Sequence, residues 1–159
     1  GTVCEMVEAD SITNEELLAL DVDILVPAAL GGVITGDNVD DIRASTIVEV
    51  ANGPVSSEAD AALAQRDVFV IPAILANAGG VTVSYFEWVQ NRQGLYWDVD
   101  EIHERLRTTM SREYHRIHSL ASTRSIDMRT AAYAHALNRI GHAIQAQGTQ
   151  RYFANHGEN

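Results

Sequence analysis

The sequence contains no lysine among its 159 residues, so all 11 of its side-chain cations are arginines. Aspartate and glutamate together number 22, which leaves a formal net charge of −11. Nucleic-acid binding requires clustered positive charge, so this acidic balance argues against a nucleic-acid partner. Two explanations of the composition stay open. The source lives in high salt, where repulsion between surface carboxylates is screened, or its genome simply favours arginine.

Long apolar runs and paired cysteines are also missing. No run approaches the roughly 20 apolar residues of a transmembrane helix, and the longest candidate, residues 68–83, is interrupted by Pro72 and by glycines. No cationic segment precedes an apolar stretch at the start, so no secretory signal is expected. The single cysteine, Cys4, cannot form a disulfide within the chain. We therefore expect a cytoplasmic protein without a membrane partner.

Three short runs rich in β-branched residues predict strands: residues 23–26 (DILV), 46–50 (TIVEV) and 68–71 (VFVI). The runs are continuous rather than alternating, which is typical of strands covered on both faces. Helix-like segments separate them. Thr13 and Glu16 form a capping-box pattern, and Ser56 or Ser57 can cap an alanine-rich helix that extends to Gln65. Strand, helix and strand at this spacing predict a parallel α/β sheet.

The second half of the sequence predicts helices. After a loop at residues 91–98, Asp98 and Glu101 form a capping pattern, and apolar side chains then recur at helical spacing. A second, alanine-rich helix is predicted over residues 127–147, with Gly148 as its stop.

Small residues follow each predicted strand, where a parallel sheet binds its ligands. The three turns are residues 27–32 (PAALGG), 51–54 (ANGP) and 77–80 (NAGG). Small residues let a flat ligand approach the backbone, and Asn52 and Asn77 each offer a donor and an acceptor. Glycine and asparagine occur in turns of every kind, so each turn alone is a weak signal. The three together predict a ligand-binding edge.

Four segments in this order resemble the glutamate dehydrogenases of the Glu/Leu/Phe/Val dehydrogenase family. They are residues 23–30 (DILVPAAL), 51–60 (ANGPVSSEAD), 77–88 (NAGGVTVSYFEW) and 127–140 (DMRTAAYAHALNRI). The combination spans most of the chain and is far more specific than a lone glycine pattern.

The resemblance implies the C-terminal portion of an NAD(P)-binding domain. The expected fold is the later strands of a Rossmann-like parallel sheet, about residues 1–91, followed by a helical region, about residues 92–159. The N-terminal substrate domain is expected to be absent from this chain. The complete enzyme would be a homo-oligomer, typically a hexamer, that converts L-glutamate and NAD or NADP to 2-oxoglutarate, ammonia and reduced cofactor.

The resemblance also implies cofactor contacts. Asn52 and Asn77 would contact the nicotinamide-ribose end, and Ala28 and Ala29 would lie against the dinucleotide. The sequence has no G-x-G-x-x-G, so the phosphate-binding turn is missing. The residue that distinguishes NAD from NADP should also lie upstream. A smaller departure is the Gly31–Gly32 pair, where the family more often has polar residues.

On the substrate side, the resemblance implies that Val81 and Ser84 face the amino acid, with the Ser84 hydroxyl donating to its side-chain carboxylate. Relatives specific for leucine, phenylalanine or valine share the NAGG turn but need an apolar pocket. An unpartnered buried hydroxyl would penalise those substrates, whereas a carboxylate satisfies it. The segment therefore indicates glutamate. A purely structural role for Ser84, donating to a helix carbonyl, stays open.

No catalytic residue is expected in this chain. The family's lysines and its acidic proton shuttle belong to the N-terminal domain, and this sequence has no lysine. The isolated chain is therefore expected to be inactive. Two alternatives remain: a non-catalytic module that kept this fold for interaction or assembly, or a piece of a branched-chain or aromatic amino-acid dehydrogenase.

No metal site is expected either. His115 and His118 lie one helical turn apart, but no cysteine or acidic cluster completes a site. Asp37, Asp40 and Asp41 lack the spacing and terminal glutamate of a calcium loop.

Overall fold

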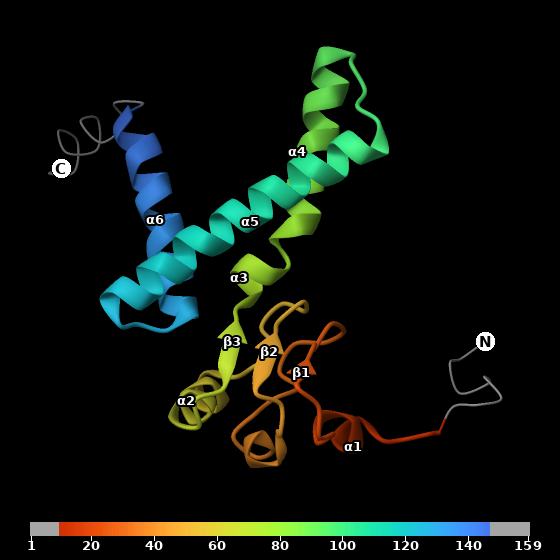
Figure 1. The fold of residues 1–159 in the computed structure, drawn as a ribbon, viewed down its shortest axis with the longest axis vertical. Coiled ribbons are helices and arrows are strands. Elements are labelled where there is room, and N and C mark those ends of the chain that lie inside the picture. Colours follow the sequence, from red (N-terminus) through yellow and green to blue (C-terminus); the bar gives the residue numbers. More distant parts are fainter. Residues whose placement is uncertain (1–9, 147–159) are drawn as a thin grey trace, which may run out of the picture. The chain divides into compact units, whose positions relative to one another are not determined.

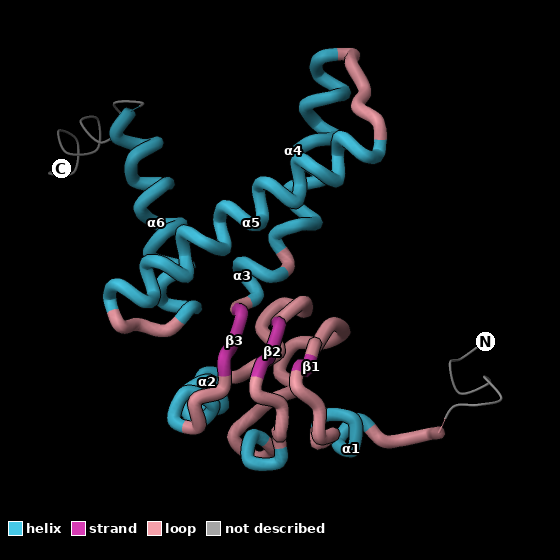
Figure 2. The backbone as a smooth tube through the Cα atoms, viewed as in Figure 1, coloured by secondary structure: helices cyan, strands magenta, loops and turns pink. Residues whose placement is uncertain are grey.

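The computed structural model describes residues 10–146 of the chain. The chain divides between Val70 and Ile71 into two compact units, which we call the sheet unit and the helical unit. Figure 2 shows their different make-up: loops and turns dominate the sheet unit, whereas the helical unit is almost entirely helix.

The sheet unit is built on three parallel strands, as predicted, and their order in the sheet is β1-β2-β3. The strands are β1 (Ile24–Leu25), β2 (Thr46–Val48) and β3 (Phe69–Ile71), which carries the chain into the helical unit. Each lies within a predicted run, although each is shorter than the run. In the register, Ile24 is opposite Thr46 and Leu25 is opposite Ile47.

The helix α1 (Asn14–Leu18) precedes β1, the 3₁₀ turn η2 (Val39–Asp41) lies between β1 and β2, and α2 (Ser57–Gln65) lies between β2 and β3. The capping box ahead of α1 is confirmed. The Thr13 hydroxyl accepts from the Glu16 N–H at 3.1 Å, and the Glu16 carboxylate accepts from the Thr13 N–H at 2.7 Å. Ser56, rather than Ser57, caps α2 by accepting from the Ala59 N–H at 3.2 Å. Local side-chain chemistry thus sets both helix starts.

The core of the sheet unit gathers around Ile47 of β2. Ile42, directly after η2, and Leu63, on α2, are buried with it. The expected cover on both faces of every strand is incomplete, because Ile24 is 57% exposed and Val26 is 49% exposed. The described helices supply buried apolar side chains to the Ile47 cluster and leave β1 open.

The helical unit consists of α3 (Ala73–Ala76), α4 (Ala78–Gln93), α5 (Val99–Arg124) and α6 (Met128–Ala146). The two long C-terminal helices are confirmed, and Asp98 caps α5 by accepting from the Glu101 N–H at 2.8 Å. Residue 148, the expected stop of α6, lies outside the described residues. The predicted loop at 91–98 begins too early, because α4 continues to Gln93 and ends at Gly94 with φ +67°.

The third predicted turn is helical along most of its length. Residues 73–76 form α3, and α4 begins at Ala78, so Gly79 and Gly80 lie inside its first turn. Only Asn77 interrupts the two helices. The prediction of a turn through Gly80 is wrong here because Pro72 sets a helix start and Leu75 anchors α3 in the core.

In the helical unit, α5 contacts both α4 and α6 (Figure 1). Ile117 and Ala121 of α5 are buried with Met128, Ala131 and Ala132 of α6. Alanine at these positions allows the two helix backbones to approach closely. Within residues 10–146, no helix combines the length and the apolar character needed to cross a membrane.

Candidate functional site

Two of the three predicted ligand-binding turns lie against each other in the sheet unit. We call residues 27–32 and 51–54 the turn pair. The Pro27 carbonyl accepts from the Val50 N–H at 3.1 Å and from the Ala51 N–H at 2.8 Å. The Gly32 N–H donates to the Gly53 carbonyl at 2.9 Å. Backbone hydrogen bonds therefore fix one turn on the other.

The turn pair brings three of the predicted cofactor residues onto one part of the sheet unit. Ala28 and Ala29 stand on the first turn and Asn52 on the second, and all three are exposed. Exposed methyl groups beside an exposed amide suit a flat ligand that carries a carboxamide or hydroxyls. This arrangement fits the nicotinamide end of a dinucleotide, and the cofactor contact itself stays a prediction.

Gly31 explains how closely the two turns approach. A Cβ atom at Gly31 would lie 2.8 Å from the Asn52 carbonyl oxygen, closer than real Cβ atoms come to backbone. Gly32 and Gly53 both have positive φ, +64° and +55°, a conformation that favours glycine. Gly31 and Gly32, where the family more often has polar residues, are therefore explained by the close approach of Gly31 and the positive φ of Gly32.

Substituting Gly31→Ala should destabilise the 159-residue chain by about 1–3 kcal/mol, because the new methyl group forces the turn pair apart. The measurement is the free energy of unfolding in urea. Gly141→Ala is the matched control, since Gly141 lies inside α6 with no atom within 4 Å of its ideal Cβ. That change should stabilise the chain by about 0.5–1 kcal/mol through helix propensity. Equal effects at the two positions would contradict the close approach.

The other three predicted site residues lie in the helical unit, on or before α4. Asn77 is half-buried between α3 and α4, and its carbonyl accepts from the Gly80 N–H at 3.3 Å. Val81 is 70% exposed and Ser84 is also exposed, and their spacing of three puts them on one face of α4. The Ser84 hydroxyl donates to the Gly80 carbonyl at 3.2 Å. The structural role left open for Ser84 is thus present.

Val81 also lines a pocket of about 510 Å³ between the four helices of the helical unit, which we call the α4 pocket. Apolar side chains, among them Leu75 and Ile117, form much of its wall. Its polar side consists of residues from α5 and α6, namely Arg112, Glu113, His135 and Arg139.

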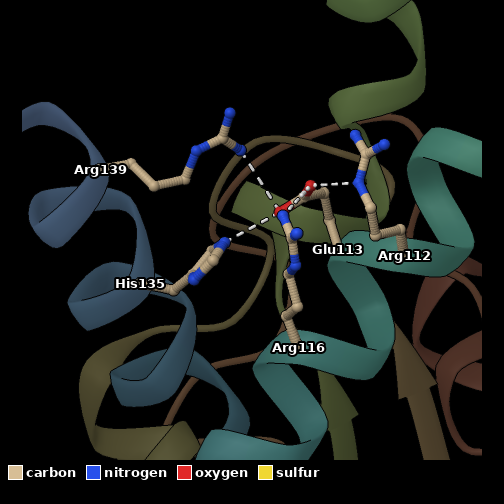
Figure 3. Close-up of polar contacts among 5 residues, drawn as sticks. All are labelled: Arg112, Glu113, Arg116, His135 and Arg139. Carbon is tan, nitrogen blue, oxygen red and sulfur yellow. Dashed lines mark hydrogen bonds and ion pairs between the residues drawn. The ribbon is translucent and has the colours of Figure 1, made fainter. Parts of the chain in front are cut away.

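Glu113 is the centre of a polar cluster that joins α5 to α6 (Figure 3). One carboxylate oxygen lies 2.8 Å from His135 Nε2 and 3.3 Å from Arg139 Nη1 of α6. The other lies 3.0 Å from Arg112 Nε and 3.1 Å from Arg116 Nη1 of α5. Burial raises the pKa of Glu113, but the hydrogen bonds from His135 and Arg112 and the charges of Arg139 and Arg116 outweigh it and hold the pKa below its usual value.

Sequence reasoning missed this cluster. The available signal was the pairing of basic residues one turn apart on both predicted helices, Arg112 with Arg116 and His135 with Arg139. Among residues 10–146, no three His, Cys, Asp or Glu side chains are arranged to hold a metal ion.

The Glutamate/Leucine/Phenylalanine/Valine dehydrogenase family profile matches residues 1–148. The chain belongs to this family. The resemblance inferred from the four sequence segments is thereby confirmed.

Curated dehydrogenases resemble the chain over nearly its whole length. It is 52% identical over 151 residues to the NADP-specific glutamate dehydrogenase of Synechocystis sp., covering 95% of this chain and 35% of that relative. It is 49% identical over 148 residues to the NAD-specific glutamate dehydrogenase of Staphylococcus aureus, covering 93% of this chain and 36% of that one. The chain thus spans about a third of the length of these glutamate dehydrogenases.

A solved structure of the family supports the fold. The hetero-hexameric glutamate dehydrogenase of Thermus thermophilus, in a leucine-bound form, matches with a TM-score of 0.83 and 33% identity. The match covers 88% of this chain and 34% of that one. The predicted α/β fold, a partial parallel sheet followed by C-terminal helices, is confirmed.

Proposed function

We propose that this chain is part of a glutamate dehydrogenase, which oxidatively deaminates L-glutamate to 2-oxoglutarate and ammonia with NAD or NADP. The observation that carries the proposal is the 52% identity, over 95% of this chain, to an NADP-specific glutamate dehydrogenase. In this function the chain supplies a wall of the active site. We propose that the complete enzyme is a homo-oligomer of six chains; the hetero-hexamer of the Thermus thermophilus relative supports the number of subunits.

On the cofactor side, the nicotinamide end fits the residues that the chain presents. The Asn52 and Asn77 amides can exchange hydrogen bonds with a carboxamide or a ribose hydroxyl. Ala28 and Ala29 offer exposed methyl groups against which a flat group can lie. The sequence has no glycine-rich phosphate turn, so we assign the diphosphate to the remainder of the enzyme. When bound, the cofactor accepts a hydride from the substrate carbon.

On the substrate side, Val81 and Ser84 form the contact surface of α4. The exposure of both side chains supports this role. The Ser84 hydroxyl bond to Gly80 is long and exposed, so rotation about χ1 can redirect the proton to a substrate carboxylate at little cost. A carboxylate rewards this donation, whereas an apolar side chain leaves the hydroxyl unpaired. Glutamate is therefore the substrate that this surface favours.

This chain exposes apolar side chains that the remainder of the enzyme can cover. Tyr85 and Trp88 of α4 are 59% and 57% exposed, and Leu137 and Ile140 of α6 are 65% and 56% exposed. Contiguous exposed apolar side chains are typical of surfaces that other protein covers. They support a role inside a larger assembly. We expect this assembly in the cytoplasm, because the single cysteine cannot form a disulfide within the chain.

The test is to express the complete reading frame that encodes this chain and to measure NAD and NADP reduction with several amino acids. Glutamate should give the highest kcat/KM. Preference for leucine, valine or phenylalanine would assign the chain to another branch of the family. Absence of reduction with every amino acid would support the non-catalytic module instead.

A further inference from the structure

A second hollow lies along α5 and α6 in the helical unit, outside the predicted cofactor and substrate residues. Its volume is about 850 Å³ and it is open to solvent. We call it the arginine hollow, and its polar lining includes Arg112, His115, Arg116, Arg124, His135 and Asn138.

The charge of this hollow is opposite to that of the chain. Three of the 11 arginines and two of the six histidines line it, in a protein with a net charge of −11. No aspartate or glutamate belongs to the lining. Glu113, which contacts residues of the lining, supplies a single negative charge that is shared among Arg112, Arg116, Arg139 and His135 (Figure 3). The positive charge of the guanidinium groups is therefore larger than the negative charge of the one carboxylate that they contact.

Arg124 adds to this excess. Within residues 10–146, no carboxylate forms an ion pair with it. Ser119 and Thr123 also line the hollow, and their hydroxyls can donate to an anion. Arg112, Arg116, Ser119 and Thr123 follow one another at intervals of three or four residues, so α5 presents its donors along one face.

Guanidinium groups bind carboxylate and phosphate oxygens through pairs of parallel hydrogen bonds. Several such groups around one hollow match a ligand with several anionic groups. A ligand with a single charge would leave most of these donors unused. The volume accommodates a small molecule rather than a polymer.

We propose that the arginine hollow is a binding site for a small oxyanion that carries at least two phosphate or carboxylate groups. The ligand contacts Arg116 and Arg124 directly and competes with Glu113 for the shared guanidinium groups. Because His135 and Asn138 come from α6, a bound anion also ties α6 to α5. This site is separate from the proposed catalytic function and does not depend on it.

The experiment titrates the 159-residue chain with pyrophosphate and with citrate by calorimetry at low ionic strength. Saturable binding is expected with a dissociation constant of about 1 mM or lower, weakened by added salt. Pyrophosphate alone binding would identify the phosphate class, and citrate alone the carboxylate class. Binding of neither anion up to about 10 mM would overturn the proposal.

Three variants make the test specific. Combining Arg116→Gln with Arg124→Gln should weaken binding by about tenfold or more, since two charge-assisted contacts are lost. Combining Arg43→Gln with Arg107→Gln removes the same charge outside the hollow and should change affinity by less than about twofold. Glu113→Gln should strengthen binding, because it removes the competing carboxylate. Equal losses in both double variants would mean general charge attraction and would overturn the site.

A measurement on the unchanged chain guards against variants that fail to fold. In a two-dimensional NMR titration with the anion that binds, the amide resonances of Ser119, Thr123 and Asn138 should shift and saturate together. Shifts confined to other elements would place the anion elsewhere and would equally overturn the proposal.

Discussion

Purified by itself, the 159-residue chain is expected to leave both NAD and NADP unreduced in the presence of glutamate. Oxidative deamination needs a group that takes protons from the substrate amine and a cation that holds its carboxylate. The resemblance to the family assigns this work to lysines and an acidic proton shuttle in the N-terminal domain, and this sequence has no lysine. The proposed contacts on α4, Val81 and Ser84, neither accept a proton nor carry charge at neutral pH. The loss relative to the complete enzyme should be total within the sensitivity of the assay.

Absorbance of the reduced cofactor measures this directly, with the complete enzyme at the same concentration of chains as the positive control. Calorimetry with NAD provides a second readout, and weak or no binding is expected because the chain lacks a G-x-G-x-x-G turn. Turnover that persists through further purification and scales with the amount of chain would contradict the prediction. It would also require a catalytic group other than lysine within these 159 residues.

The parts of the fold that the sequence predicted well are those that local chemistry decides. Thr13 with Glu16, Ser56 and Asp98 each satisfy the free N–H groups of a helix start with their own side chains. Such a cap needs only residues within one turn, so the sequence pattern contains it. The strands were located for a similar reason, since β-branched runs such as 46–50 favour extended backbone by themselves.

The prediction of a turn over the whole NAGG segment is wrong because packing overrides the local preference of these residues. Glycine and asparagine favour turns in isolation, yet Gly79 and Gly80 lie inside α4. The decision depends on packing: Leu75 is 5% exposed in the core formed with α5 and α6, and this anchor holds α3 and the start of α4. A contact between residues about 40 positions apart leaves no mark on a local pattern.

The residues of the candidate site also fall into those that a local motif predicts and those that only packing brings together. Resemblance supplied Asn52, Asn77 and Ser84, because a motif keeps its residues in order along the chain. The paired basic residues of the Glu113 cluster are visible in the sequence, but its centre is not, since Glu113 meets His135, 22 residues further along the chain, only where α5 packs against α6. Likewise, the requirement for Gly31 depends on its distance of 2.8 Å to the Asn52 carbonyl, which no spacing rule contains.

In the complete enzyme, Ser84→Ala should lower kcat/KM for glutamate by roughly 10- to 100-fold, the size expected when one hydrogen bond to a charged group is lost. Norvaline, in which a methyl group replaces the side-chain carboxylate of glutamate, is the comparison substrate. Because the hydroxyl has nothing to donate to in norvaline, the loss with norvaline should be small. The ratio of the two kcat/KM values is the quantity to measure.

The matched control is Ser122→Ala on α5. The Ser122 hydroxyl donates to the His118 carbonyl at 2.9 Å, four residues back, as the Ser84 hydroxyl donates to Gly80 on α4. Losing this bond should leave both kcat/KM values unchanged, since Ser122 lies outside the proposed substrate surface. If Ser84→Ala lowers activity equally for glutamate and norvaline, the hydroxyl acts only on its own helix. A selective loss for glutamate would mean that Ser84 exchanges the Gly80 carbonyl for the substrate carboxylate during the reaction.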